Sequence, residues 1–212
     1  HRQAQSERPN PIVLLDHGHQ WLKSDDPEED KYLDKTLVGV DQDTGATIAA
    51  TVGSKVEDDH AFKKVMQWIK FLGHQTMELR VDQAAEMTAI QERIRVQRAA
   101  ESPMNRTIPS WGKLHDSQSM GAVESCISQW RAKMKTLRYF LQDTYGCIVG
   151  TNHPIWPYMI KHAARLNIRF TVKPDGRTAW WNMAGKNYNG QIWPFGEIVS
   201  LKVPETKSWK HK

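Results

Sequence analysis

Three carboxylates stand at points in the sequence where a fold could bring them together. Asp16 ends the apolar run PIVLLD, Asp82 ends the run TMELRVD, and Glu124 follows the small, polar stretch DSQSMG. Three carboxylates at one place repel one another unless cations bind there. Oxygen ligands favour hard ions such as Mg²⁺ or Mn²⁺, and a pair of such ions supports displacement at a phosphodiester. The residue types therefore indicate metal-dependent phosphoryl chemistry as one interpretation, since aspartates at strand ends also serve in turns.

Short strands are predicted to carry the two aspartates. The runs at 11–16 and 76–82 are apolar and of strand length. Residues 36–55 contain two β-rich runs joined by DQDTG, which predicts a hairpin with a glycine in the turn. We expect the first three strands to be antiparallel neighbours. If the strands that end at Asp16 and Asp82 are neighbours too, both carboxylates lie at one edge of a sheet.

Helices are expected to flank these strands. The segment AAEMTAIQERIRVQRAA after Asp82 is rich in helix-forming residues. Residues 101–119 contain Pro, Gly, Ser and Asn without a period, which predicts a mobile loop, and residues 191–204 end in an alternating, strand-like run. Further helices are predicted at 58–73, 152–170 and 175–186.

The segment from about Gly121 to Tyr145 is the most informative predicted helix. Its apolar residues fall at alternating steps of four and three, which predicts one buried stripe made of Val123, Ile127, Trp130, Met134, Leu137 and Leu141. One position further along runs a polar stripe made of Glu124, Ser128, Arg131, Lys135 and Arg138. This stripe begins with an acid and then becomes basic, as a metal ligand beside a nucleic-acid track would, although a solvated face can look similar.

Charge is distributed unevenly along the chain of 212 residues. Residues 1–119 carry 15 Lys and Arg against 19 Asp and Glu, a net charge of −4, whereas residues 120–212 carry 14 against 5, a net charge of +9. The second part therefore suits a polyanion. The polar start HRQAQSERPN and the lack of a long apolar run support neither secretion nor a membrane span. The two cysteines, Cys126 and Cys147, support neither a disulfide scaffold nor a zinc site.

These motifs, in this order, resemble the catalytic core of retroviral and long-terminal-repeat retrotransposon integrases, the DDE branch of the ribonuclease H-like fold. The hairpin LVGVDQDTGATIAATVGSK, the stretch DQAAE after the second strand and the loop DSQSMGAVES carry the resemblance, together with DGRTAWWNMAGK further on. It extends over roughly residues 11–203. It implies an α/β fold with a mixed five-stranded sheet flanked by helices.

The resemblance also implies roles for individual residues. Asp16, Asp82 and Glu124 would be the catalytic carboxylates and would bind two Mg²⁺ or Mn²⁺ ions. Asp41 also looks motif-like, but it falls in the second strand and is expected to form a turn instead. The expected DNA contacts are Ser117, Gln118, Gly121, Arg131, Lys135 and Arg138.

The implied activity is that of a polynucleotidyl transferase that processes the DNA ends of a retroelement and joins them to target DNA. The departures from the family pattern are the 42 positions between Asp82 and Glu124, Gln83 and Ala84 in place of Asn-Gly, and Ala179 in place of Pro. Two alternatives stay open: a nuclease or transposase-like enzyme of the same fold, and a decayed core that binds nucleic acid or self-associates without catalysis.

Further expectations concern domains, partners and location. Residues 1–10 are expected to be a linker or upstream polyprotein segment, 11–185 the core, and 186–212 an extension toward a following domain. The expected partners are DNA, further copies of the chain and other polyprotein products, with no membrane. The resemblance implies action in the nucleus, and otherwise a cytoplasmic particle rather than a secreted protein.

Overall fold

The centre of the fold is one mixed sheet of five strands with the order β3-β2-β1-β4-β5. The computed structural model describes residues 9–18, 35–52, 59–112, 119–150 and 153–198. The strands are β1 (Ile12–Gly18), β2 (Thr36–Asp41), β3 (Thr47–Thr51), β4 (Thr76–Val81) and β5 (Arg106–Trp111). β1, β2 and β3 are antiparallel neighbours, whereas β4 runs parallel to β1 and β5 runs parallel to β4. The predicted five-stranded mixed sheet is therefore confirmed.

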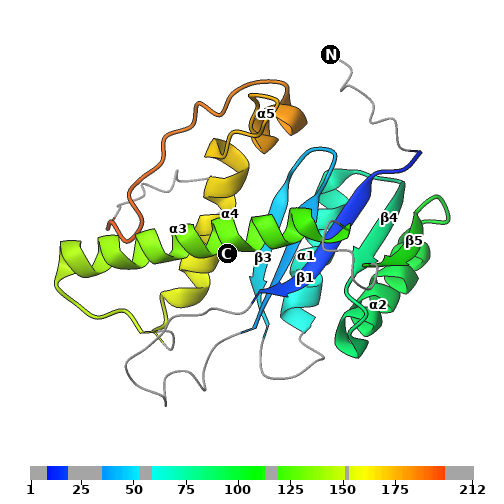
Figure 1. Cartoon of the computed structure of the whole chain (residues 1–212), viewed down its shortest axis with the longest axis horizontal. Helices are drawn as coiled ribbons and strands as arrows, with labels where there is room; N and C mark the ends of the chain where they lie inside the picture. The colour runs from blue at the N-terminus through cyan, green and yellow to red at the C-terminus, as the bar shows by residue number, and fades with distance from the viewer. Residues whose placement is uncertain (1–8, 19–34, 53–58, 113–118, 151–152, 199–212) are drawn as a thin grey trace, which may run out of the picture.

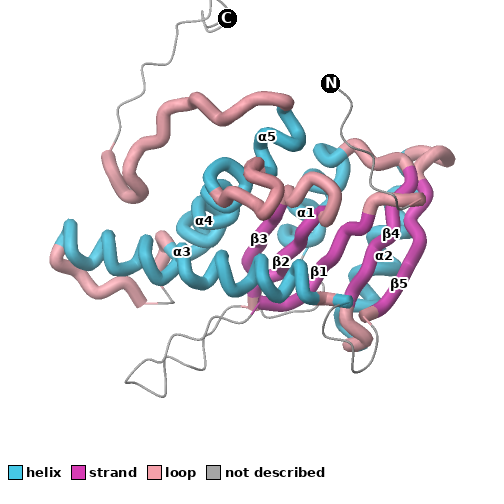
Figure 2. The backbone as a smooth tube through the Cα atoms, turned by 45° about the horizontal axis from the view of Figure 1, so that its top comes forward, coloured by secondary structure: helices cyan, strands magenta, loops and turns pink. Residues whose placement is uncertain are grey.

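Helices cover both faces of this sheet (Figures 1 and 2). The helices are α1 (Asp59–Leu72), α2 (Ala85–Glu101), α3 (Gly121–Tyr145), α4 (Trp156–Phe170) and α5 (Ala179–Ala184). Leu14 and Val38 point to a core under α3 and α4, whereas Val13 and Leu15 point to a second core under α1 and α2. The alternation of side chains along a strand produces these two cores, because successive residues face opposite sides of the sheet.

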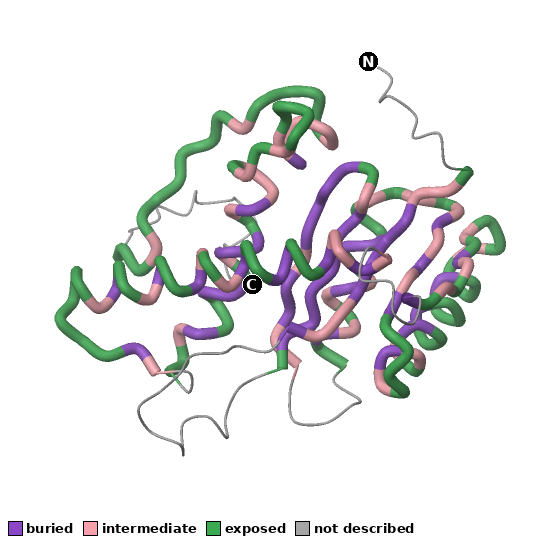
Figure 3. Tube along the Cα trace, in the orientation of Figure 1, coloured by how far each residue is buried: buried purple, intermediate pink, exposed green. Residues whose placement is uncertain are grey.

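The buried stripe predicted for α3 is confirmed. All six apolar residues of the stripe are buried, together with Cys126. Figure 3 shows the same division, with the central strands buried and the outer sides of the helices exposed. The buried apolar stripe sets the rotation of α3 about its axis. The polar stripe that begins at Glu124 therefore lies along the side of the helix next to the buried face. No helix within the described ranges is long and apolar enough to cross a membrane.

The structure corrects three boundaries. Residues 106–111, predicted as part of a mobile loop, form the edge strand β5. Helix α4 begins at Trp156 rather than at 152, and α5 is limited to Ala179–Ala184. The strand-like end of the run at 191–204 lies almost entirely after residue 198, outside the described residues, and stays a prediction. β5 was missed because it contains Pro109 and alternates weakly, features that an edge strand tolerates.

The segment after α5 runs back toward the C-terminal end of α3 (Figure 1). The ring of Phe195 packs on His162 of α4 at 4.9 Å between ring centroids. The Tyr145 hydroxyl donates a hydrogen bond of 2.9 Å to the carbonyl of Gly196. Phe195 and Gly196 therefore anchor this largely exposed segment to α3 and α4.

Candidate active site

Asp16 and Asp82 lie at the same edge of the sheet on neighbouring strands. The last residues paired between the parallel strands β1 and β4 are Leu15 and Val81, and the two aspartates follow them directly. Leu15 and Val81 both face the core under α1 and α2. By the alternation of side chains, the next residue on each strand is directed to the α3 side. The register therefore brings the two predicted carboxylates next to each other, with Asp16 half-buried and Asp82 exposed.

Each of these carboxylates also accepts a local backbone hydrogen bond. Asp16 Oδ1 accepts from the backbone N–H of His17 at 2.7 Å. Asp82 Oδ1 accepts from the N–H of Gln83, also at 2.7 Å. Such bonds fix the rotamer of each carboxylate while leaving further lone pairs for another ligand.

Helix α3 carries the polar stripe against the end of β1. A Cβ atom at Gly18 would lie 3.5 Å from Trp130 and 3.6 Å from Ile127, which are ordinary packing distances, so α3 packs directly on this end of β1. Burial lowers the pKa of Arg131, and the negative charge of Asp16 opposes that shift. The charge of Asp16 thus acts on Arg131. Glu124 is exposed in the first turn of α3, two turns before Arg131 on the same side of the helix.

Contacts across β4 and β5 position the start of α3 beside Asp82. The side-chain amide of Gln83 donates to the carbonyl of Gly112 at 3.1 Å. A Cβ atom at Gly112 would lie 2.8 Å from Cγ of Met120, the residue before α3, so the Met120 side chain packs directly on the Gly112 backbone. Arg80 of β4 also donates to the carbonyl of Ser119 at 3.2 Å. The beginning of α3 is therefore tied to the strand that carries Asp82.

The structure does not assemble a complete three-carboxylate site. Across the described residues, no three Asp, Glu, His or Cys side chains lie close enough to hold one metal ion. Asp16 and Asp82 are neighbours by register, and Glu124 stands at the start of α3, the helix on this side of the sheet. Of the predicted DNA contacts, Ser117 and Gln118 lie outside the described residues. The others belong to α3: Gly121 opens the helix, Lys135 is exposed, and Arg131 and Arg138 are half-buried.

Asp41 lies away from this edge. It pairs with Val13, at the opposite end of β1 from Asp16, and is fully buried. Its carboxylate accepts hydrogen bonds from the Thr44 hydroxyl at 2.5 Å and the Thr44 N–H at 3.3 Å, as predicted for a turn-forming residue. Burial would raise the pKa of Asp41, but the bonds to His74 and Thr44 outweigh it and hold the pKa below its usual value.

A polar cluster on the other side of the same edge was not predicted. Lys35 Nζ lies 3.1 Å from Glu86 Oε2, and His17 Nδ1 lies 3.7 Å from the same oxygen. The three residues come from α2 and the strand region of β1 and β2, so no sequence spacing could have shown their contact. Glu86 is the last residue of the stretch DQAAE that begins at Asp82. The cluster ties the start of α2 to the strand that carries Asp16.

The sheet order, the antiparallel hairpin and the helices on both faces define a ribonuclease H-like α/β fold. This is the fold of the catalytic cores of retroviral integrases. The HTLV-2 integrase catalytic core domain, in complex with magnesium in a trimeric form, matches with a TM-score of 0.56 at 20% identity, over 84% of this chain and 99% of that chain. The catalytic core domain of BIV integrase matches with a TM-score of 0.53 at 15% identity, over 80% and 90% of the two chains.

A third solved structure is a chain of the simian T-cell lymphotropic virus intasome in complex with PP2A regulatory subunit B56 gamma. It matches with a TM-score of 0.53 at 17% identity, over 94% of this chain and 60% of that chain. No protein-family model matches the sequence, and no curated protein matches it. The predicted integrase-core fold is therefore confirmed, at the level of the fold.

Proposed function

We propose that the protein is a metal-dependent polynucleotidyl transferase that processes and joins DNA ends, as an integrase of a retroelement. The observation that supports it best is the placement of Asp16 and Asp82 side by side on parallel strands, under a helix whose polar stripe begins with Glu124 and continues with cations. A fold alone would not carry this proposal, because one fold serves many activities. The carboxylate edge adds a specific chemistry to the fold.

The residues present suit a pair of hard divalent ions. Asp16 and Asp82 supply neighbouring carboxylate oxygens from two strands, and Glu124 would complete the set from α3. Mg²⁺ or Mn²⁺ bound there would activate a water or a 3′-hydroxyl and stabilise the leaving oxygen. The chain itself would hold the ligands in place through the strand register and would hold the DNA backbone through the basic side chains of α3.

We propose DNA and further copies of this chain as its partners, and the nucleus of a host cell as the place of action. The support is that the similar HTLV-2 core domain was solved in trimeric and dimeric forms with magnesium, and that another similar chain belongs to an intasome. In the alternative of a decayed core, the protein would still bind DNA or self-associate, but it would not catalyse strand cleavage or joining. The presence of all three carboxylates favours the enzyme.

Activity separates these proposals. With Mn²⁺ and a short DNA duplex, the wild-type protein should nick or join strands. Asp82→Asn should abolish both reactions while DNA binding persists, because the substitution removes a charge and keeps the shape. Asp43→Asn, an exposed aspartate in the β2–β3 turn, is the matched control and should retain activity. Equal behaviour of the wild type and Asp82→Asn would leave only the binding module.

A further inference from the structure

The outer face of α4 carries a row of cations beside one exposed aromatic side chain. The buried residues of the helix, which pack on the core, are Trp156, Met159, Ile160, Ala163, Ala164 and Asn167. Tyr158, Lys161, Arg165 and Arg169 follow one another at steps of three, four and four, which places them together on the roughly opposite side of the helix. Tyr158 is 69% exposed, Lys161 and Arg165 are exposed, and Arg169 is half-buried. These four residues form the α4 ridge.

The α4 ridge is separate from the carboxylate edge. Helix α4 packs against the edge strand β3, where the Thr47 hydroxyl donates to the carbonyl of Ala164 at 3.5 Å. Strand β2 lies between β3 and β1, the strand that ends near Asp16. Figures 1 and 2 show α4 on the β3 side of the sheet, away from β4 and β5. The candidate active site therefore does not use this surface.

No acid neutralises the ridge within the part of the chain that the structure describes. Helix α4 contains neither Asp nor Glu, and none of the described carboxylates forms an ion pair with Lys161, Arg165 or Arg169. The charge of Arg165 lowers the pKa of Lys161, as do burial and the charge of Lys64. Lys64 belongs to α1, which meets β3 from the other face of the sheet. Like charges thus gather around this edge and repel one another unless an anion binds there.

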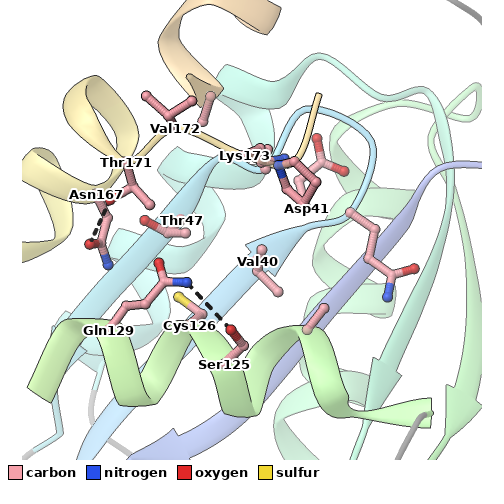
Figure 4. Close-up of a pocket in the computed structure, with 15 residues that line it drawn as sticks. Val40, Asp41, Thr47, Ser125, Cys126, Gln129, Asn167, Thr171, Val172 and Lys173 are labelled. Atoms are coloured by element: carbon pink, nitrogen blue, oxygen red, sulfur yellow. Dashed lines mark hydrogen bonds between the residues drawn. The ribbon is translucent and has the colours of Figure 1, made fainter. Parts of the chain in front are cut away.

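Lys173, shortly after α4, is a cation in the opposite situation. It lines a cavity of about 540 Å³ beside α3 and the β2–β3 hairpin, and Figure 4 shows its nitrogen beside Asp41. Burial lowers the pKa of Lys173, and the negative charges of Asp175, Asp41 and Asp43 oppose that shift. Acids of the chain itself balance Lys173, whereas the cations of the α4 ridge are left for an external anion.

Aromatic rings hold the last cation of the ridge in place. The guanidinium carbon of Arg169 lies 4.7 Å from the ring centroid of Tyr188 and 5.4 Å from that of Trp180. These two rings meet edge to face, with their centroids 5.1 Å apart. Stacking on the rings stabilises the guanidinium and limits its rotamers. An arginine that is already ordered loses less conformational freedom when it binds a phosphate.

The spacing of the cations suits the backbone of a nucleic acid. Lys161, Arg165 and Arg169 are each four residues apart, which is about 6 Å along the helix axis. This rise is similar to the distance between successive phosphates of one strand. Tyr158 continues the row with a ring on which a base can stack, and cations beside aromatic rings are typical of nucleic-acid surfaces. A second copy of the chain fits less well, because a symmetric contact would bring the same cations together.

We propose that the α4 ridge, together with Lys64, binds the phosphate backbone of a nucleic-acid strand, as a second site apart from the polar stripe of α3. Contacts to phosphates position a strand without reading its sequence. One chain would then hold two nucleic-acid segments at once. The inference requires neither the carboxylates nor a metal, so it can fail or succeed independently of the proposed function.

DNA binding in the absence of metal tests the proposal. The starting protein lacks the basic part of the α3 stripe, through alanine at Arg131, Lys135 and Arg138. In EDTA it should still bind a labelled short duplex, as measured by fluorescence anisotropy. Adding Lys161→Gln and Arg165→Gln should reduce the slope of log K against log salt by about 0.9 for each lost phosphate contact, or about 1.8 in total. Lys70→Gln, at an exposed position of α1, is the matched control and should leave the slope unchanged.

A second probe shows which form of nucleic acid supplies the phosphates. If a single strand is the ligand, a short thymidine strand should bind more tightly than the duplex, and Tyr158→Ala should weaken it several-fold through lost stacking. If a duplex is the ligand, the duplex should bind more tightly and Tyr158→Ala should have little effect. Either result supports the proposal when Lys161→Gln and Arg165→Gln reduce the salt slope.

Three results would overturn the proposal. The first is an equal slope with and without the two glutamine substitutions, in proteins whose far-ultraviolet circular dichroism is unchanged. The second is tighter binding of a polyglutamate peptide than of either DNA, which would assign the ridge to an acidic protein segment. The third is a change in oligomeric state without a change in DNA binding, which would assign the ridge to a contact between copies of the chain.

Discussion

Asp16 and Asp82 directly follow Leu15 and Val81, the last residues paired between the parallel strands β1 and β4. Two residues that are 66 positions apart in the sequence therefore become neighbours at one edge of the sheet. Their charges repel each other, and Arg131 of α3 is a cation on which the charge of Asp16 acts. The arrangement suits a site that gains stability when a divalent cation enters.

The basic part of the α3 stripe should determine how DNA binding depends on salt. Replacing Arg131, Lys135 and Arg138 by Ala should reduce the slope of log K against log salt by about 0.9 for each phosphate that the variant no longer neutralises. Fluorescence anisotropy with a labelled duplex at several salt concentrations measures this slope. Lys70→Ala, an exposed position in the last turn of α1, is the control. An unchanged slope in the triple variant would show that these three side chains do not contact the DNA backbone.

Arg80 should stabilise the junction between the sheet and α3. It donates to Glu78 Oε1 at 2.5 Å and to the carbonyl of Ser119 at 3.2 Å. Arg80→Leu leaves a half-buried carboxylate without its cation and should lower the free energy of unfolding by about 1–3 kcal/mol. Urea denaturation measures the decrease, and Arg106→Leu on the exposed edge strand should cost much less. Equal decreases would show that the junction does not depend on Arg80.

Asp41 should contribute to stability against acid. Its folded pKa is below the ordinary value of 3.8, so the contribution is present above 3.8 and is lost as the pH falls through the folded pKa. Asp41→Asn should therefore unfold more easily at neutral pH, and its stability should depend less on pH below about 4. Urea denaturation between neutral and acid pH measures both effects. If the free energy of unfolding falls equally with decreasing pH in the wild type and in Asp41→Asn, the proposed role of this carboxylate is contradicted.

The two cysteines should differ in reactivity. Cys126 is 6% exposed, and burial raises its pKa to about 12, whereas Cys147 is exposed after α3. A thiol reagent at mildly alkaline pH should modify one thiol per folded chain, because the thiolate is the reactive form. Cys147→Ser should abolish the fast reaction. Rapid modification of two thiols in the folded wild type would contradict the packing of α3.

Local patterns predicted the parts of the fold that depend on neighbouring residues. The stripe of α3 follows from apolar spacing, and the β2–β3 hairpin follows from the turn around Gly45. The helix predicted over 58–73 is α1, and Gly73 follows it with a φ of 75°. These features are set by residues close in sequence, which is why their types and spacing were enough.

Other parts depend on contacts between distant segments. β5 carries Pro109 and gains its hydrogen bonds from β4, so its own residues gave little strand signal. The bonds from Arg80 to Ser119 and from Lys35 to Glu86 join segments that only the sheet order brings together. The neighbouring positions of Asp16 and Asp82 could be expected only on the assumption that their strands are adjacent, which the register confirms.

Locating bound Mn²⁺ tests the central claim most directly. Crystals grown with Mn²⁺ and measured for its anomalous scattering should show a peak between the carboxylates of Asp16 and Asp82, with Glu124 turned toward it. The same peak should disappear in Asp82→Asn. An ion bound only at other residues, or no peak at saturating Mn²⁺, would contradict the account.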